Sequence, residues 1–354
     1  MTEKIQSALK HIAQSPAGQE RFIELLLQLE PSLRKEGLDV REEITGPLVD
    51  GLYGDDDRLQ KTLSDGTVVE FLYRSKIARD FLMSQPSVPD HVWEPQTTKL
   101  LVHLAKGCRT AVVGGAYFGD QAILIAKEMA KSGGTLHAFE PNKEQMGMLR
   151  RNMELNGVRN IEVQNKGLWD SSSAHLTLVG YDSFAHPEQA EAGAEDAFST
   201  VTIDEYLESA GASTLDLIML DIEGAELRAL QGARRMIERS GSGPAIVFEV
   251  HRHYVDWTNG LQNTDIIRYL SSLGYTSYAV RDYNSNHDMA GLPVELIPAD
   301  AVYLEGPPHG FNMMAVKDPA RVSGPEFRIR RGVSPKLLLH RDPKLHQPVP
   351  DTAA

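Results

Sequence analysis

The sequence is poor in cysteine and has no long apolar run. Cys108 is the single cysteine in 354 residues, so the chain cannot form an internal disulfide or assemble a cysteine-based zinc cage. No segment approaches the roughly 18 uncharged apolar residues of a membrane-spanning helix, and the N-terminal segment lacks the apolar stretch of a signal peptide. We therefore expect a protein of the cytoplasm, without a membrane span.

Basic residues are also in short supply. The chain has 36 Lys and Arg against 49 Asp and Glu, which gives a formal net charge of −13. Proteins that bind nucleic acids draw affinity from clusters of Lys and Arg that neutralise phosphates. We therefore expect no nucleic-acid partner. The hydrophobic share of 41% and charged share of 24% are typical of a folded globular protein.

The first part of the chain is predicted to be an α+β appendage, residues 1–95. Apolar residues recur at helical spacing from Glu3 to about Lys35. Two strand-like runs then flank Asp65-Gly66, a pair that favours a hairpin turn because glycine tolerates positive φ.

From residue 96 to 318 the pattern becomes strands alternating with amphipathic helices, which indicates an α/β domain built on a largely parallel sheet. A polar, Ala/Glu-rich stretch at about 181–198 is predicted to be a loop insertion. Residues 319–354, rich in proline, are predicted to be an extended tail. The strands are expected at 110–115, 135–140, 161–166, 215–220, 245–250, 276–280 and from 310, and the main helices at 142–156, 225–239 and 265–273.

The first candidate site motif is a glycine-rich turn, Gly114-Gly115-Ala116-Tyr117-Phe118-Gly119, directly after an apolar strand. Glycines at such a turn let a ligand approach the backbone closely. This pattern fits a nucleotide-cofactor turn or an ordinary loop. A dinucleotide GxGxxG fingerprint would need glycine at position 116, so Ala116 disfavours NAD without excluding it.

The second motif is Phe139-Glu140-Pro141-Asn142, at the end of the next strand. Glu140 lies 21 residues beyond Gly119, where an acid commonly binds a ribose diol. The alternative is a helix N-terminal role, because acids and a following proline favour that position.

Two further acidic motifs follow buried strands. Asp221 and Glu223 end the most apolar strand, and Glu249, His251 and His253 follow the next. Ligands in open α/β sheets bind at the carboxyl ends of strands, so these side chains are expected near the glycine turn. If the extended geometry persists, alternation places Glu249, His251 and His253 on one side.

Taken in order, the motifs resemble the FkbM-type methyltransferases, class I enzymes that depend on S-adenosylmethionine. The resemblance spans about residues 95–317, and the DIEGAE segment with the helix after it is its most specific part. It implies a Rossmann-like sheet of seven strands, the last one antiparallel, and methyl transfer to oxygen. It is carried by GGAYFG, HAFEPN, MLRRNMELN, TIDEYL, LDLIMLDIEGAELRALQGA, AIVFEV and GFNMMAV.

The resemblance also implies roles for individual residues. Glu140 would hold the ribose, and Asp221 would lie near the methionyl amine and the sulfonium. The family usually has an acid where this chain has Val113, and Asp120 is the substitute we assign for the ammonium contact. The cofactor-binding set is thus predicted as Gly115, Ala116, Tyr117, Gly119, Asp120, Glu140, Pro141, Asn142 and Asp221.

For catalysis we predict Asp221, Glu249 and His251. Because a hydroxyl has a high pKa, a base is expected beside the acceptor oxygen, and the hypothesis gives this role to His251, oriented by Glu249. We assign no dedicated metal ligand, but a competing mechanism places a divalent cation such as Mg²⁺ on Asp221, Glu249 and His251.

The acceptor is expected to be a small molecule or glycan that carries a hydroxyl on a sugar, glycan or secondary metabolite. Two other functions stay open: a nicotinamide-dependent oxidoreductase, and a methyltransferase-like scaffold without activity. A homo-oligomer is also left open.

Overall fold

The computed structural model describes residues 3–35, 37–180, 186–191, 193–194, 196–239, 241–304 and 310–340. Parts of the predicted insertion and the end of the predicted tail therefore lie outside the described residues. In the described part of the chain, no helix has the length and apolar character needed to cross a membrane.

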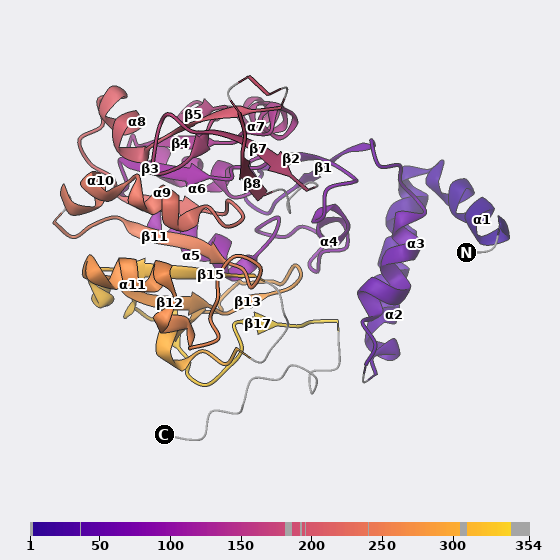
Figure 1. Ribbon diagram of the computed structural model, residues 1–354. Coiled ribbons are helices and arrows are strands. Elements are labelled where there is room, and N and C mark those ends of the chain that lie inside the picture. The colour runs from indigo at the N-terminus through magenta and orange to yellow at the C-terminus, as the bar shows by residue number, and fades with distance from the viewer. Residues whose placement is uncertain are drawn as a thin grey trace.

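The N-terminal region consists of helices that stand to one side of the sheet domain, followed by a β-hairpin that packs against it (Figure 1). The hairpin confirms the turn at Asp65-Gly66, since its two strands pair antiparallel and Gly66 has a φ of 84°. The elements are α1 (Glu3–Ala13), α2 (Pro16–Leu33), the π-helical turn Arg41–Thr45, α3 (Gly46–Asp50), β1 (Arg58–Thr62), β2 (Val68–Leu72) and α4 (Ala78–Leu82).

The sheet domain alternates strands and helices as predicted from residue 95 onward. Its helices are α5 (Pro95–Leu104), α6 (Ala122–Ala130), α7 (Lys143–Leu155), α8 (Ile203–Ser209), α9 (Glu226–Gln231), α10 (Arg234–Arg239) and α11 (Asp265–Ser272). Its strands are β3 (Thr110–Gly114), β4 (Thr135–Phe139), β5 (Ile161–Gln164), β10 (Leu217–Leu220), β11 (Ala245–Val250), β12 (Thr276–Val280), β14 (Val294–Pro298), β15 (Phe311–Val316) and β16 (Phe327–Ile329).

The order of these strands confirms the class I, Rossmann-like fold. Seven of them lie in the order β5-β4-β3-β10-β11-β15-β12, and β15, the last of the seven in the chain, is antiparallel to both its neighbours. Two strands absent from the prediction, β14 and β16, extend the sheet beyond β12 to nine strands. They are short and follow irregular segments, so no clear periodicity marks them.

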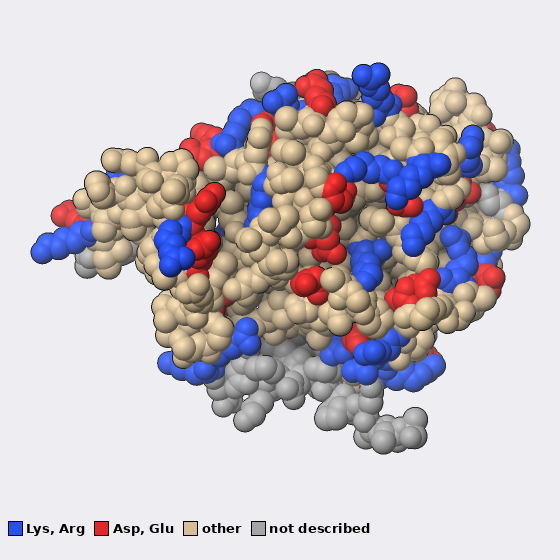
Figure 2. Space-filling view, turned by 180° about the vertical axis from the view of Figure 1, so that it is seen from behind, with Lys and Arg blue, Asp and Glu red and all other residues tan. Residues whose placement is uncertain are grey.

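Apolar layers cover both faces of the sheet. One buried cluster joins the sheet to α5, α6 and α7, and the other joins it to α8, α9, α10 and α11. β3, β10 and β15 are buried along their whole length, and burial on both faces explains why most of their residues are apolar. On the face of the molecule shown in Figure 2, Lys and Arg are interspersed with Asp and Glu.

The insertion after β5 forms a small second sheet. Its strands are β6 (Gly167–Leu168), β7 (His175–Val179), β8 (His186–Gln189) and β9 (Phe198–Val201). We expected a loop over 181–198, but β8 within that range pairs antiparallel with β7. β8 is a polar strand at the edge of this sheet. No alternation of apolar and polar residues marks it, so the sequence pattern did not indicate a strand there.

The segment after residue 317 packs on the domain, where we expected an extended tail. β17 (Lys336–Leu337) pairs with β13 (Asp282–Tyr283), and His340 is buried against the N-terminal region. The His340 ring lies 3.1 Å from the Ser285 hydroxyl and 3.5 Å from the Glu30 carboxylate. Glu30 in turn accepts a 2.7 Å hydrogen bond from Arg41, so the segment after residue 317 and the N-terminal helical region meet in one buried polar network.

This network makes stability sensitive to mild acid. Burial, assisted by the charge of Arg41, lowers the pKa of His340 to about 4, below its value of roughly 6.5 in an unfolded chain. The charges of Glu30 and Asp39 oppose this shift, whereas Arg34 adds to it. The contribution of neutral His340 to the free energy of unfolding is therefore complete above about pH 6.5. It declines as the pH falls toward 4, because the unfolded chain takes up the proton first.

We expect a lower thermal midpoint at pH 5 than at pH 7. In the variant His340→Gln this pH dependence should be smaller, because the titrating ring is gone. An equal slope in both proteins, measured by thermal unfolding, would contradict the assignment.

Candidate active site

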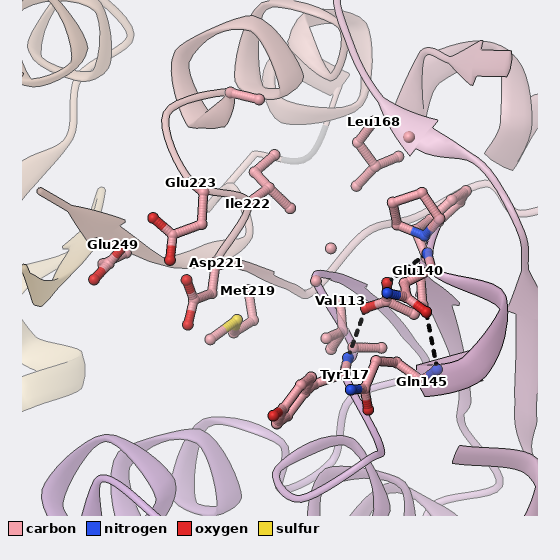
Figure 3. A pocket seen from close by; sticks show the side chains of 18 of the residues that line it. Val113, Tyr117, Glu140, Gln145, Leu168, Met219, Asp221, Ile222, Glu223 and Glu249 are labelled. Carbon is pink, nitrogen blue, oxygen red and sulfur yellow. Dashed lines mark hydrogen bonds between the residues drawn. The ribbon is translucent and has the colours of Figure 1, made fainter. Parts of the chain in front are cut away.

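A cavity lies at the carboxyl ends of β3, β4, β10 and β11, where the sheet edge, the N-terminal region and the C-terminal segment meet. Figure 3 shows Glu140 and Tyr117 at one end and Asp221, Glu223 and Glu249 gathered at the other. Most of the predicted residues line it. They are Gly115, Ala116, Tyr117, Asp120, Glu140, Pro141, Asn142, Asp221, Glu249 and His251.

The glycine turn is packed so tightly that only glycine fits at its first bend. Gly115 has a φ of 73°, and a Cβ atom built on it would lie 1.8 Å from the carbonyl oxygen of Asp221. The backbone N–H groups of Gly115 and Ala116 both donate to the carbonyl of Phe139, at 3.0 and 3.1 Å. The turn is thus joined to the ends of both neighbouring strands, β10 and β4.

Gly119 is not among the residues that line the cavity, and its predicted contact with the cofactor stays a prediction. It has a φ of 92°, and a Cβ atom there would lie 2.6 Å from the Leu149 side chain on α7. Its glycine is required by close packing of the turn on a helix. A glycine in a turn can serve close packing on a helix or close approach of a ligand, so the motif alone could not distinguish these two roles.

Glu140 connects the glycine turn to the start of α7. One carboxylate oxygen accepts from the Tyr117 N–H at 2.9 Å, and the other from the Asn142 N–H at 2.8 Å (Figure 3). The N-cap of α7 is Asn142, whose side chain accepts from the N–H groups of Glu144 and Gln145. Each Glu140 oxygen keeps a lone pair for a ligand. Burial raises the pKa of Glu140 to about 7.

At the other end, three carboxyl groups converge. Ligand oxygens of Asp221, Glu223 and Glu249 lie within 4.8 Å of one another. Burial raises the pKa of all three, and the charge of Asp221 adds to the rise at Glu223 and Glu249. Carboxylates this close do not all ionise without a compensating cation. The arrangement can therefore hold a cationic group or keep protons at neutral pH.

Glu94 is a site residue that the motifs did not reveal. It lines the same cavity as Asp120, and its carboxylate accepts a 3.1 Å hydrogen bond from the Gln121 side chain. Burial, with the charge of Asp221, raises the pKa of Glu94 to about 8, and burial raises that of Asp120 to about 7. Glu94 precedes α5 in a segment without any recognisable pattern.

Backbone strain concentrates at this cavity. Among the described residues, the non-glycine residues with positive φ are Glu94, Tyr117 and Glu223, at 49°, 48° and 50°. All three line the cavity. Each such conformation costs about 1–3 kcal/mol and persists where the surroundings enforce it, which is common at binding sites.

His251 lies beside Glu249, but the predicted strand alternation ends before it. β11 stops at Val250, and the N–H groups of Tyr254 and Val255 both donate to the His251 carbonyl at 2.9 Å. This turn carries His253 to an exposed position, where its ring contacts the His251 ring with centroids 4.6 Å apart, but His253 does not line the cavity with Glu249 and His251. The His253 N–H also donates to His251 Nδ1 at 3.2 Å, which leaves the neutral ring with its hydrogen on Nε2.

Two lysines reach the cavity from outside the central sheet. Lys76 follows β2 in the N-terminal region, and Lys336 begins β17 near the end of the described chain. The charges of both lysines oppose the rise of the Asp221 pKa. No local motif pointed to either residue, because each is placed only by tertiary packing.

Comparisons with solved structures find methyltransferases. An FkbM methyltransferase from Methylobacillus flagellatus KT is 16% identical over 59% of this chain and 44% of its own length, with a TM-score of 0.35. A precorrin-6y C5,15-methyltransferase from Geobacter metallireducens GS-15 is 13% identical over 63% of this chain and 89% of its own, with a TM-score of 0.34.

An O-methyltransferase from Bacillus cereus, solved in complex with SAH, is 15% identical over 66% of this chain and 85% of its own, with a TM-score of 0.35. Among curated protein sequences, none matches this chain significantly.

The family comparison bears directly on the motifs that line the cavity. Residues 114–277 match the model of the methyltransferase FkbM domain, a range that contains the glycine turn, Glu140, Asp221 and Glu249. The resemblance seen in the motifs is thereby confirmed for this part of the chain, which is similar to the methyltransferase FkbM domain.

Proposed function

We propose that the protein is an S-adenosylmethionine-dependent O-methyltransferase that acts on a hydroxyl of a sugar, glycan or secondary metabolite. The observation that carries this proposal is Glu140, a buried carboxylate that bridges the glycine turn and α7 and keeps free lone pairs toward the cavity. A ribose diol offers two hydroxyl donors, which match such a carboxylate.

The residues at the site fit this cofactor by charge and by shape. Glu140 would take the ribose hydroxyls, and Leu168, which lies on the same side in Figure 3, offers an apolar surface for the adenine. Asp120 and Glu94 would take the ammonium, and Asp221 would face the sulfonium. The cofactor supplies a methyl group that is already activated by positively charged sulfur, so the protein's main task is to align the acceptor oxygen with it.

The acceptor hydroxyl must lose its proton, and Glu249 is the better placed base. His251 was our sequence hypothesis, but its Nδ1 lone pair is occupied by the His253 N–H and its Nε2 carries the hydrogen. Burial raises the pKa of Glu249 well above the usual range. A carboxylate of raised pKa is a stronger base. His251 would then donate to the acceptor or to Glu249.

Calorimetry tests the proposal against its alternatives. We expect S-adenosylhomocysteine to bind the full-length protein and NAD not to bind. Preferential binding of NAD would favour an oxidoreductase, and no heat with either ligand would favour a scaffold without activity. Incubation with labelled methyl donor and a panel of nucleotide sugars, followed by mass spectrometry, identifies the acceptor.

Metal removal separates the base mechanism from the cation mechanism. The structure brings Asp221 and Glu249 together with Glu223 rather than with His251 as a ligand set, so a cation would bind those three acids and lower the pKa of the hydroxyl directly. With Glu249 as the base, activity should persist after EDTA treatment. Loss of activity on chelation, restored by Mg²⁺, would instead support the cation mechanism.

Cofactor affinity should depend on pH. The raised pKa values of about 8 for Glu94 and about 7 for Asp120 leave these groups largely neutral in mild acid, where they cannot offset the cofactor's positive charges. We therefore expect affinity for S-adenosylmethionine to fall as the pH drops from 8 to 6, and binding at pH 7 to release protons. Calorimetry in buffers of different ionisation enthalpy measures the release.

The variant Glu94→Gln is the matched control for this pH dependence, because its side-chain oxygen can still accept from Gln121. It should flatten the pH profile between 7 and 8. A wild-type affinity that stays constant from pH 6 to 8 would show that neither carboxyl binds the ammonium.

A further inference from the structure

The small sheet formed by β6, β9, β7 and β8 has two faces of different character. On one face Leu178 pairs with Pro187, and Leu176 pairs with Phe198. Residues directly opposite each other in a sheet, and residues two apart along a strand, point to the same side, so these four side chains share one face. On the other face, Thr177 lies opposite a glutamate. One face is thus apolar and the other polar, a pattern typical of an antiparallel sheet that covers an apolar core.

The apolar face is turned toward the candidate active site. All four of its side chains line the cavity that also holds Glu140 and Glu249. In the part of the chain that the structure describes, the buried apolar clusters include neither Leu178 nor Phe198, and both side chains are half-buried. Apolar side chains that line a cavity keep surface for a ligand, and contact with an apolar ligand removes that surface from water.

This face extends beyond the part of the cavity that the adenine would use. At one end, Phe198 packs on Gly167 of β6, where a Cβ atom would lie 2.5 Å from the phenylalanine ring. Gly167 precedes Leu168, the surface proposed for the adenine. Pro187 lies at the opposite side of the sheet, because the strand order is β6-β9-β7-β8. Neighbouring strands are about 4.8 Å apart, so roughly 14 Å separates β8 from β6, which is wider than a purine ring.

The far end of the face lies beside the end of β11. The ring of His186, the first residue of β8, lies 5.8 Å from the Tyr254 ring, and the Tyr254 ring lies 5.7 Å from the His251 ring, measured between centroids. His251 follows the strand that carries the proposed base. The start of β8, with Pro187 and the Leu178 opposite it, is therefore on the acceptor side of the cavity.

We propose that Leu178 and Pro187 bind an apolar group of the acceptor, an aromatic ring or an alkyl chain next to the hydroxyl that is methylated. This inference rests on the proposed methyltransferase function and narrows its acceptor to an amphipathic molecule. A free sugar or a nucleotide sugar would place polar groups against this face, where they lose water without gaining hydrogen-bond partners. Leu178 and Pro187 determine specificity, and Glu249 remains the proposed base.

Calorimetry with two matched probes tests the apolar face without knowledge of the acceptor. The probes are naphthol, which carries its hydroxyl on an apolar ring, and methyl glucoside, which carries its hydroxyls on a polar ring. Each is titrated into full-length protein saturated with S-adenosylhomocysteine, so that the cofactor site is filled. We expect naphthol to bind about tenfold or more tightly than methyl glucoside, because its ring buries more apolar surface.

The variant Leu178→Gln keeps the approximate size of the side chain but places an amide on the apolar face. It should bind naphthol about tenfold more weakly than the wild type, whereas Leu178→Met should retain binding. The matched control is Val179→Gln, at a neighbouring residue that points to the other face, is 39% exposed and does not line the cavity. This control should bind naphthol as the wild type does. If circular dichroism shows that Leu178→Gln does not fold, Pro187→Ser on the paired strand replaces it.

The possible outcomes separate the acceptor from the cofactor. Weaker binding of naphthol with unchanged affinity for S-adenosylhomocysteine supports the proposal. The proposal is overturned if naphthol binds no more tightly than methyl glucoside, or if the folded Leu178 and Pro187 variants bind naphthol as well as the wild type. It is also overturned if these variants lose S-adenosylhomocysteine to the same degree as naphthol, because the face would then serve the cofactor.

Failure of the methyltransferase proposal would look different. In that case the wild type would not bind S-adenosylhomocysteine at all, and the acceptor assignment would fall with it. Failure of the acceptor assignment alone leaves the binding of S-adenosylhomocysteine intact and changes only the result with naphthol.

Discussion

Gly115→Ala is expected to abolish binding of S-adenosylmethionine and S-adenosylhomocysteine. The methyl group would lie 1.8 Å from the Asp221 carbonyl oxygen, well inside van der Waals contact, and the residue would have to keep a φ of 73° that disfavours every residue with a Cβ. The turn can relieve this clash only by moving away from β10. Such a movement separates the Tyr117 N–H from Glu140 and displaces Asp221, so both ends of the cofactor site are lost together.

The control for this variant is Gly147→Ala in α7. A Cβ atom at Gly147 meets nothing within 4 Å, and alanine is favoured over glycine inside a helix by roughly 1 kcal/mol. Gly147→Ala should therefore bind the cofactor normally and unfold at a slightly higher temperature. Calorimetry measures binding, and circular dichroism verifies that Gly115→Ala is folded. A folded Gly115→Ala protein with wild-type affinity would show that the turn does not form the cofactor site.

The central site could be predicted because its signals are local. The glycine turn and Glu140 each follow a buried strand directly, and the carboxyl ends of parallel strands meet at one sheet edge. Their hydrogen bond, from Tyr117 N–H to Glu140, is a consequence of that topology. The structure shows that Asn142 is the N-cap of α7 and that Glu140 also accepts from the Asn142 N–H, so a helix N-terminal role and the predicted ribose contact are compatible.

Other site residues carried no local signal. No sequence pattern marks Glu94, Lys76 or Lys336. Lys336 is placed by the pairing of β17 with β13. Glu94 is placed by the start of α5, where two backbone N–H groups donate to the Asp282 carboxylate. Sequence spacing says nothing about such neighbours, because about 240 residues separate Glu94 from Lys336.

One helix also differs from its prediction for a tertiary reason. The apolar spacing predicted a single helix over 225–239, but the structure has α9 and α10 with a break at Gly232. A Cβ atom on Gly232 would lie 2.1 Å from the Trp169 carbonyl oxygen, and the Gly232 carbonyl accepts from the Asp204 N–H. The helix is interrupted where the backbone of the insertion passes against it, which helical periodicity could not show.

Glu249→Gln is expected to lower kcat by about 10²- to 10⁴-fold, the usual contribution of a general base. Glutamine keeps the shape that the cavity requires, since Gly310 packs so closely that a Cβ there would lie 2.1 Å from a Glu249 oxygen. Affinity for S-adenosylhomocysteine should therefore stay near that of the wild type. Because burial, together with the charge of Asp221, raises the pKa of Glu249, wild-type kcat should increase with pH as this carboxyl ionises.

Comparison with His251→Asn decides between the two candidate bases. If Glu249 is the base, Glu249→Gln removes the rising limb of the pH profile, whereas His251→Asn keeps that limb and loses less activity, since asparagine can still donate a hydrogen bond. If His251 accepts the proton, the order reverses: His251→Asn becomes the more damaging change, and its pH profile is the one that flattens. The His253 N–H on Nδ1 favours the first result, because a ring nitrogen that already accepts one hydrogen bond has no lone pair left for the substrate proton.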